Sequence, residues 1–211
     1  MIAARRTSEG VPPPLLVLLH GIGSNEDDLA SLAGELDPRF LAVSVRAPRP
    51  YHGGWAWFHI TFRSGGDIVP DLEQAHETLA DFVGWLAAAP ARLGADPRRV
   101  YLLGFSQGAM MSLGVLRTAP ERVAGIIALS GCSVDELVEA PADDGAVARV
   151  PVFVAHGIQD RTLPVSDGRA IRDQLQPIVR DFTYREYPIP HTIAPDELRD
   201  VATWLTARLD R

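Results

Sequence analysis

The most informative part of the chain reads Val100-Tyr101-Leu102-Leu103-Gly104-Phe105-Ser106-Gln107-Gly108. The residues up to Phe105 are mostly apolar, β-branched or aromatic, which predicts a buried strand. Apolar residues at helical spacing then continue to Leu116. The join has the pattern G-x-S-x-G, in which a sharp strand-to-helix turn forces the central residue to positive φ, and glycines allow close backbone approach. Ser106 is therefore expected to present its hydroxyl at a sheet edge, beside a helix N-terminus that stabilises developing negative charge.

Strand and helix patterns alternate along the rest of the chain. Strands are predicted at residues 15–20, 40–45, 100–105, 123–130, 150–156 and 182–187, and helices at residues 26–36, 70–93, 107–116, 166–175 and 195–209. This alternation predicts an α/β fold with a mostly parallel, doubly wound sheet, right-handed crossovers and helices on both faces. The 211 residues suffice for one such domain, residues 1–211, and no repeat or low-complexity linker interrupts them.

Three segments lack a regular pattern. Residues 1–14 are polar and then proline-rich, and we expect them to follow or extend an edge of the sheet. Residues 53–58 form an aromatic, glycine-bearing loop, and residues 134–147 are acidic and predicted to be a surface loop with at most a short helix.

The composition narrows the class of protein. The formal net charge is −7 at pH 7, and basic runs interleaved with aromatic residues are absent, which argues against a nucleic-acid partner. The one cysteine, Cys132, cannot form an internal disulfide, so a reducing compartment and a cytoplasmic location are expected. No apolar stretch approaches the length of a membrane span, and Leu15–Leu19 is too short for the apolar core of a signal peptide. We therefore expect no stable membrane insertion.

In an open α/β sheet, functional groups collect in the loops at the carboxyl ends of the strands. A serine hydroxyl needs a positioned base to act as a nucleophile near neutral pH, and that base needs a carboxylate to fix its tautomer. Ser106, Asp160 and His191 supply these groups, each just after a predicted strand. Their chain order, Ser…Asp…His, is that of the α/β-hydrolase arrangement. The sequence therefore predicts a catalytic triad.

Four segments resemble the carboxylesterase, phospholipase and acyl-protein thioesterase family of small α/β-hydrolases. They are Leu-His-Gly-Ile-Gly at 19–23, Gly-Phe-Ser-Gln-Gly at 104–108, His-Gly-Ile-Gln-Asp at 156–160 and the aromatic segment at 55–58. The resemblance covers nearly the whole chain and implies an α/β-hydrolase fold without a large cap domain.

The resemblance also implies a role for each site residue. Ser106 would be the nucleophile, His191 the general base and acid, and Asp160 its orienting partner. The backbone N–H groups of Ile22 and Gln107 would form the oxyanion hole. The chain departs from the family in one place: Pro190 precedes His191, where glycine is usual, and a proline narrows the backbone freedom of that loop.

Some residues near these motifs have an alternative interpretation. His20 and His156 lie in His-Gly pairs at strand ends and are expected to make structural hydrogen bonds. Cys132, just past the fourth predicted strand, is expected to be a small buried hydrophobe. Other carboxylates could orient the base in principle, but none directly follows a strong strand in a glycine turn; they are Asp135, Asp143, Asp144 and Asp167.

Trp55, Trp57 and Phe58 are predicted to contact the substrate, because aromatic residues in a glycine-rich loop at this end of the sheet often line a pocket. Burial in the core is the alternative for these three. No group of His, Cys and carboxylates has metal-ligand spacing, and no P-loop or dinucleotide-binding pattern occurs, so neither a metal nor a cofactor is predicted.

The sequence therefore predicts a serine hydrolase that cleaves carboxylic esters, with thioesters as a further class, through an acyl-enzyme intermediate. Short to medium acyl groups are expected, because the chain leaves no segment long enough for a lid domain. Two alternatives stay open: a catalytically silent scaffold of the same fold that binds a small molecule, and a lysophospholipase or acyl-protein thioesterase. The sequence does not determine the oligomeric state, and a homodimer is left open.

Overall fold

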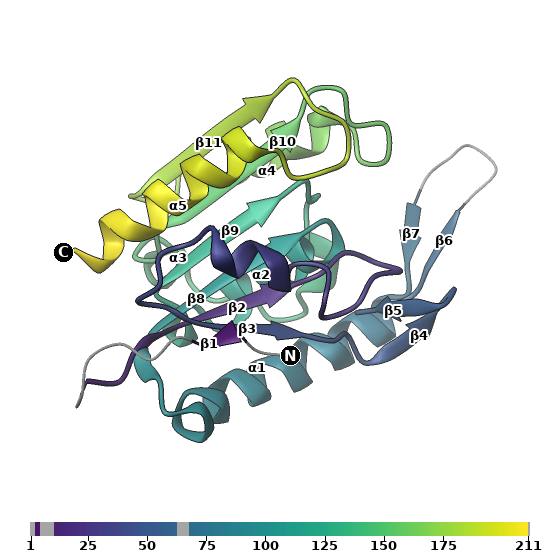
Figure 1. Ribbon diagram of the computed structural model, residues 1–211. Helices are drawn as coiled ribbons and strands as arrows, with labels where there is room; N and C mark the ends of the chain where they lie inside the picture. Colours follow the sequence, from purple (N-terminus) through teal and green to yellow (C-terminus); the bar gives the residue numbers. More distant parts are fainter. Residues whose placement is uncertain (1–2, 5–10, 63–67, 211) are drawn as a thin grey trace.

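A seven-stranded sheet forms the centre of the computed structural model, which describes residues 3–4, 11–62 and 68–210 (Figure 1). In spatial order the strands are β1 (Ala3–Ala4), β3 (Leu41–Val45), β2 (Pro14–Leu19), β8 (Asp96–Phe105), β9 (Gly125–Leu129), β10 (Val152–Gly157) and β11 (Phe182–Tyr187). Every neighbouring pair is parallel except β1 and β3, which are antiparallel. The predicted parallel sheet is confirmed, and β1 lies along its edge as expected for part of residues 1–14.

Four helices of more than ten residues pack around the sheet: α1 (Leu72–Leu93), α2 (Gln107–Thr118), α4 (Val165–Leu175) and α5 (Pro195–Leu209). The acidic segment 134–147 holds only the 3-10 turn η3 (Asp135–Leu137) and the short helix α3 (Asp144–Val147), as predicted. A further 3-10 turn, η2 (Pro120–Arg122), follows α2. Helix α1 begins after the predicted Pro70, because the Asp71 side chain accepts a hydrogen bond from the Gln74 N–H and so caps the helix.

The helix predicted at residues 26–36 is wrong, because this segment contains only the 3-10 helix η1 (Ala30–Gly34). The Asn25 side chain accepts a hydrogen bond from the Asp27 N–H, a local contact that competes with helix formation. Leu29 and Leu36 are nevertheless buried, so the apolar spacing that suggested a helix is satisfied by turns.

The aromatic loop at 53–58 is more regular than its sequence predicted. It belongs to a hairpin of β4 (Arg49–Tyr51) and β5 (Gly54–Ala56), and a second hairpin joins β6 (Ile60–Phe62) to β7 (Ile68–Pro70). His52 and Gly53, between β4 and β5, both have positive φ, 44° and 87°. Two positive φ angles are the signature of a type I′ turn, whose twist matches that of paired strands.

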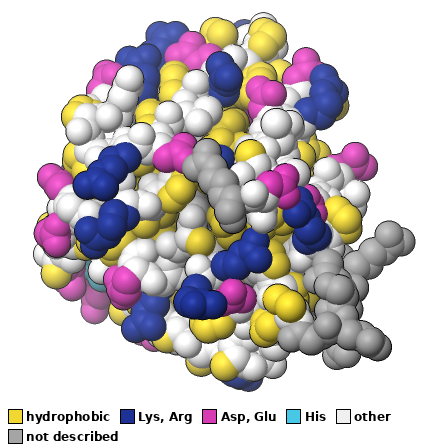
Figure 2. Space-filling view, turned by 90° about the vertical axis from the view of Figure 1, so that its left-hand side faces the viewer, with side chains coloured by type: hydrophobic (Ala, Val, Ile, Leu, Met, Phe, Trp, Pro, Cys, Tyr) yellow, Lys and Arg dark blue, Asp and Glu magenta, His cyan; other side chains and the backbone are white. Residues whose placement is uncertain are grey.

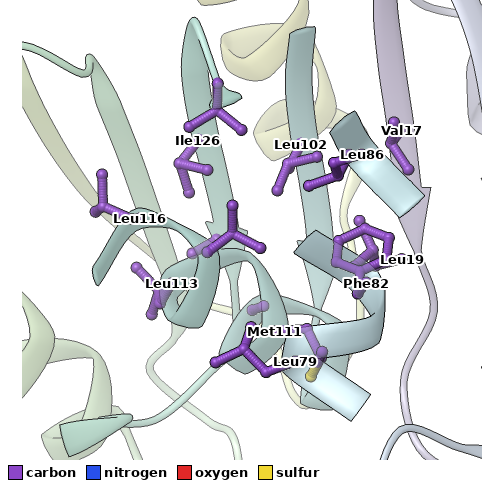
Figure 3. Close-up of a cluster of buried hydrophobic side chains, with 14 of the residues drawn as sticks. Val17, Leu19, Leu79, Phe82, Leu86, Leu102, Met111, Leu113, Leu116 and Ile126 are labelled. Atoms are coloured by element: carbon purple, nitrogen blue, oxygen red, sulfur yellow. The ribbon is translucent and has the colours of Figure 1, made fainter. Parts of the chain in front are cut away.

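Two apolar layers cover the faces of the sheet, because side chains alternate along each strand. On one face the odd-numbered residues of β2 pack with α1, α2 and α4, and Figure 3 shows part of this layer, including Val17, Leu79, Phe82 and Met111. On the other face the even-numbered residues of β2 pack with α5 and with residues flanking η1. The predicted cover of helices on both faces is confirmed for α1, α2, α4 and α5.

The surface carries arginine as its only strongly basic side chain, because all basic residues other than histidine are arginine. On the face shown in Figure 2, arginines and acidic side chains are interspersed. Among the described residues, no helix is both long and apolar enough to cross a membrane.

Candidate active site

Ser106 lies at the sharp turn between β8 and α2, with φ of 54° and ψ of −118°. Its backbone N–H donates to the carbonyl oxygen of Leu129 on β9, at 2.9 Å. The flanking glycines are required by close contacts. A Cβ at Gly104 would lie 2.1 Å from the carbonyl oxygen of Gly108, and a Cβ at Gly108 would lie 2.0 Å from that of Leu19. The turn therefore holds a strained, non-glycine residue against the end of β2.

Asp160 and His191 meet through a hydrogen bond between His191 Nδ1 and Asp160 Oδ2, at 2.6 Å. The other carboxylate oxygen of Asp160 accepts from the N–H groups of Thr162 and Leu163, at 2.8 and 3.0 Å. Asp160 is buried, and its three hydrogen bonds fix the orientation of the carboxylate. With the proton on Nδ1 facing Asp160, Nε2 of a neutral His191 is an acceptor.

His191 and Ser106 are linked indirectly in this structure. The ring of Phe105, the neighbour of Ser106, packs against the His191 ring with centroids 4.8 Å apart. In the part of the chain that the structure describes, Ser106 Oγ makes no hydrogen bond, although the residue is only 6% exposed. Catalytic hydrogen bonds are often loose without substrate and tighten when it binds.

Pro190 takes part in the turn that carries His191. Its carbonyl oxygen accepts from the Thr192 N–H at 2.8 Å, so the turn uses the group that proline retains. A Cβ at Gly157 would lie 2.4 Å from the carbonyl oxygen of Ile189, which shows how closely this loop packs on the end of β10.

The two predicted oxyanion-hole donors lie at the ends of different elements. Ile22 follows β2, and Gln107 is the first residue of α2. Neither backbone N–H donates to a protein acceptor within residues 3–4, 11–62 and 68–210. Both residues also line the cavity beside Ser106. The groups are therefore available to a bound oxygen atom.

The cavity beside Ser106 has a volume of about 470 Å³. Its apolar walls come from six elements or loops and comprise Ile22, Ile60, Pro70, Met110, Leu137 and Leu163. Acidic side chains also face it, namely Asp135, Glu136 and Asp167. Burial is the main cause that raises the pKa of Asp167 above its usual value.

The aromatic residues expected to line the acyl pocket lie elsewhere. Trp57 and Phe58 are 2% and 0% exposed and belong to the core beneath the sheet, where Trp57 contacts Phe82 edge-on. Trp55 is half-buried and packs under the guanidinium of Arg46, 4.9 Å from the ring centroid. None of the three lines the cavity beside Ser106. The expectation that Trp57 and Phe58 contact substrate is therefore corrected: they are core residues, the alternative that their burial favours.

The cavity is also lined by residues that the sequence analysis did not predict. Met110 lies on the first turn of α2, Leu137 on η3, and Leu163 three residues after Asp160. The position of Leu163 could have been predicted, since residues just after a predicted catalytic acid lie at the same sheet edge. The positions of Met110 and Leu137 could not, because a pocket-lining side chain and a core side chain have the same apolar character in sequence.

The histidines of the two His-Gly pairs are buried and make hydrogen bonds to the backbone, as expected. His20 Nδ1 lies 2.7 Å from the Gly21 carbonyl oxygen, and its Nε2 accepts from the Ala47 N–H at 3.1 Å. Burial lowers the pKa of His20, so the ring is neutral near pH 7. His156 Nε2 donates to the Leu163 carbonyl oxygen at 2.8 Å and so helps to hold the turn after Asp160.

Cys132 and the other described acidic residues do not form an alternative catalytic group. Cys132 lines the cavity, and burial, with the charge of Asp167 adding to it, raises the pKa of its thiol to about 12, which leaves it protonated and weakly nucleophilic near neutral pH. Of the described acidic residues, Asp160 is the one that accepts a hydrogen bond from His191. The described residues contain no group of three or more His, Cys, Asp and Glu that could hold a metal ion.

Comparison with known protein families gives a match along almost the full chain. The model of the phospholipase/carboxylesterase family matches residues 6–209. Acyl-protein thioesterase 1 of Saccharomyces cerevisiae is 31% identical over 211 aligned residues, which cover 92% of each chain. A probable carboxylesterase of Oryza sativa subsp. japonica is 26% identical, covering 92% of this chain and 87% of its own length.

Solved structures show the same fold. The esterase PE8 superposes with a TM-score of 0.80 and is 30% identical, and the match covers 98% of both chains. The carboxylesterase of Bacillus cereus gives a TM-score of 0.82 at 21% identity, covering 93% of this chain and 89% of the other. The fold is therefore the α/β-hydrolase fold, in a small protein with no large cap domain among its described residues.

Proposed function

Because this chain belongs to the phospholipase/carboxylesterase family of hydrolases, we propose that it cleaves carboxylic esters and thioesters of short to medium acyl groups through an acyl-enzyme on Ser106. The observation that carries the proposal is the hydrogen bond between His191 Nδ1 and Asp160 Oδ2. These two residues and Ser106 all follow the carboxyl ends of strands of the same parallel sheet. A buried carboxylate that fixes the tautomer of a histidine is the support that a serine nucleophile requires.

In the first step, His191 removes the proton from Ser106 as the hydroxyl attacks the substrate carbonyl. Asp160 keeps the other ring proton on Nδ1, so that Nε2 has the lone pair for this transfer. The positive charge that develops on the ring is stabilised by the same carboxylate. The strained turn presents Ser106 at the N-terminus of α2, whose dipole favours the developing negative charge.

The carbonyl oxygen becomes an oxyanion in the tetrahedral intermediate. The free N–H groups of Ile22 and Gln107 are the proposed donors to it. Such donors contribute most in the transition state, and losing one of them costs about 3 kcal/mol in a measured case. His191 then gives its proton to the leaving alcohol or thiol, which completes the acyl-enzyme. A water molecule activated by His191 repeats the sequence and releases the acid.

The cavity supports the choice of acyl group. Its volume of about 470 Å³ lies near the lower end of the range for ligand pockets, roughly 300–1,000 Å³. Met110, Leu137 and Leu163 provide apolar surface for an acyl chain, and each buried methylene adds about 0.8 kcal/mol while it still contacts protein. Thioesters enter the proposal because several relatives are named acyl-protein thioesterase, and because both substrates pass through the same type of oxyanion.

The experiment combines active-site labelling with a substrate series. A fluorophosphonate probe is expected to label the wild type and not the Ser106→Ala variant. Turnover of p-nitrophenyl esters is expected to rise from acetate to medium chains and then fall, and an acyl thioester is expected to be cleaved by the wild type alone. Equal labelling of the Ser106→Ala variant, or an optimum at palmitoyl length, would contradict the proposal.

A further inference from the structure

The two proposed oxyanion donors belong to two segments that are far apart in sequence. A third segment, Gly54–Phe58, makes hydrogen bonds to each of these two segments. We call this segment the bridging segment. On one side it contacts the loop after β2, which carries Ile22, and on the other it contacts the side chain of Gln107. Its position therefore bears on the separation between the two donors.

Three hydrogen bonds hold the bridging segment to the loop after β2. The Gly23 N–H donates to the Trp55 carbonyl oxygen and the Trp55 N–H to that of Ser24, both at 2.8 Å. The indole N–H of Trp57 donates to the His20 carbonyl oxygen, at 2.9 Å. The approach is too close for a side chain at Gly54, where a Cβ would lie 2.0 Å from the Gly23 carbonyl oxygen.

Two further hydrogen bonds hold the bridging segment to the start of α2. Gln107 Oε1 accepts from the Trp57 N–H at 2.8 Å, and Gln107 Nε2 donates to the Phe58 carbonyl oxygen at 2.7 Å. Gln107 is only 3% exposed, so both bonds are shielded from water. The residue that offers its backbone N–H to the oxyanion is thus fixed through its own side chain.

Trp57 is the one residue of this set that reaches both sides, through its backbone N–H and its indole N–H. On the loop side, its indole holds the His20 carbonyl oxygen, while the His20 ring donates to the Gly21 carbonyl oxygen. The Gly21 carbonyl and the Ile22 N–H belong to one planar trans peptide and point in opposite directions. The His20 ring therefore aims the Ile22 N–H by fixing that carbonyl, and the Trp57 indole acts one step further away, by holding the backbone of His20.

We propose that Trp57, through the bridging segment, sets the separation and direction of the two oxyanion donors, Ile22 N–H and Gln107 N–H. Trp57 is then a positioning residue for the transition state rather than a wall of the acyl pocket. The inference rests on the proposed function, because it matters only if an oxyanion forms between these donors. Preorganised donors act on the transition state more than on the ground state, so a disturbance should lower kcat and leave KM nearly unchanged.

The test replaces Trp57 by phenylalanine, which keeps an aromatic ring in the core and removes the indole N–H donor together with part of the ring system. Trp204→Phe is the matched control: Trp204 is also buried, on α5 in the core layer of the other sheet face, and its indole N–H has no hydrogen-bond partner among the described residues. Both variants lose part of a buried ring, and only Trp57→Phe loses a hydrogen bond of the indole.

For Trp57→Phe we expect kcat for a short-chain p-nitrophenyl ester to fall about tenfold, the size of one buried hydrogen bond, with KM changed less than about twofold. The inhibition constant of a trifluoromethyl ketone, whose adduct with Ser106 places an oxyanion between the donors, should rise by the same factor. Trp204→Phe should change neither quantity. A Trp57→Phe variant that matches Trp204→Phe in kcat and in inhibitor affinity would overturn the inference.

Gln107→Met keeps the test decisive if Trp57→Phe folds poorly. This change removes both side-chain hydrogen bonds to the bridging segment and keeps the length of the side chain. It should show the same loss in kcat and in ketone affinity, and the double variant should lose less than the product of the single losses, because both act through one segment. A raised KM with unchanged ketone affinity would overturn the inference. A wild type that neither reacts with fluorophosphonate nor cleaves esters would instead overturn the proposed function.

Discussion

Ser106, Asp160 and His191 are expected to act as one unit, because a single proton transfer uses all three. Ser106→Ala and His191→Ala should each lower kcat by about 10⁴- to 10⁶-fold. Asp160→Asn keeps an oxygen for the N–H groups of Thr162 and Leu163, but removes the charge that faces His191, and should cost about 10⁴-fold. The double variant Ser106→Ala/His191→Ala should be no worse than either single variant. Multiplicative losses, measured by steady-state kinetics, would contradict the assignment.

Glu197 is a second residue whose environment predicts a measurable effect. It is fully buried in the first turn of α5, where one carboxylate oxygen accepts from the Ala194 N–H at 3.3 Å and the other has no hydrogen-bond partner within the described residues. Burial raises its pKa from 4.5 to about 7. Because the folded state holds this proton more tightly than the unfolded state, stability should fall as pH rises from about 4.5 to 7 and then level off.

A pKa difference of this size corresponds to a loss of about 3 kcal/mol across that range. In Glu197→Gln this part of the pH dependence should disappear, so the stability of the variant relative to the wild type should be higher above pH 7 than at pH 5. Urea unfolding at pH 5 and pH 8 measures the free energy of unfolding of both proteins. Glu35→Gln is the control, since Glu35 is exposed. An unchanged pH dependence in Glu197→Gln would refute the prediction.

At the scale of elements, the close packing of α2 on β2 depends on the absence of a side chain at Gly108. A Cβ there would lie 2.0 Å from a carbonyl oxygen of β2, so Gly108→Ala must push the helix or the strand away. We expect the free energy of unfolding to fall by about 3 kcal/mol, the upper end of the range for overpacking, together with loss of activity. Gly84→Ala is the matched control on α1, because no heavy atom lies within 4 Å of its Cβ position. It should stabilise the protein by about 0.5–1 kcal/mol. Thermal unfolding of both variants checks the contrast, and equal effects would contradict it.

The elements that sequence predicted best are those in which a long local pattern agrees with burial. The strand at 182–187 and the helix at 195–209 have the predicted ends. The segment at 26–36 shows the limit of such reasoning, since Leu29 and Leu36 are buried without a helix between them. An apolar spacing reports which residues face the core, and turns can satisfy the same spacing.

At the scale of the whole molecule, the meeting of Asp160 and His191 could be predicted because parallel strands deliver their following loops to one edge of the sheet. The walls of the cavity could not. Met110 and Leu137 come from α2 and η3, and only the packing of these elements across the sheet edge decides which of their apolar side chains face the cavity. Trp57 was misplaced for the same reason: burial depends on what covers the segment after β5, and the sequence of that segment does not contain this information.

The charge of the molecule predicts a preference among substrates of equal size. The chain carries a formal net charge of −7, and the described lining of the cavity includes Asp135, Glu136 and Asp167 and no arginine or histidine. A cationic group in this cavity meets attraction from three carboxylates, each worth about 0.2–1 kcal/mol where exposed to water. Butyrylcholine and 3,3-dimethylbutyl butyrate have nearly the same shape and differ by one positive charge. We expect the cationic ester to have a KM lower by about three- to tenfold at low ionic strength, and the difference to shrink as salt screens the field.

Two variants locate the source of this preference. Asp167→Asn and Glu136→Gln should each narrow the difference in KM between the two esters, while Asp144→Asn, outside the cavity lining, should leave it unchanged. Burial raises the pKa of Asp167, so this carboxylate takes up a proton at a higher pH than an ordinary aspartate does. The difference in KM should therefore begin to narrow at a higher pH in the wild type than in Asp167→Asn. The neutral ester serves as the reference throughout, so a change in the chemistry of Ser106 alters both rates and cancels in the ratio. Equal KM values for the two esters at low salt, or a difference that does not respond to salt, would show that the carboxylates do not act on bound substrate.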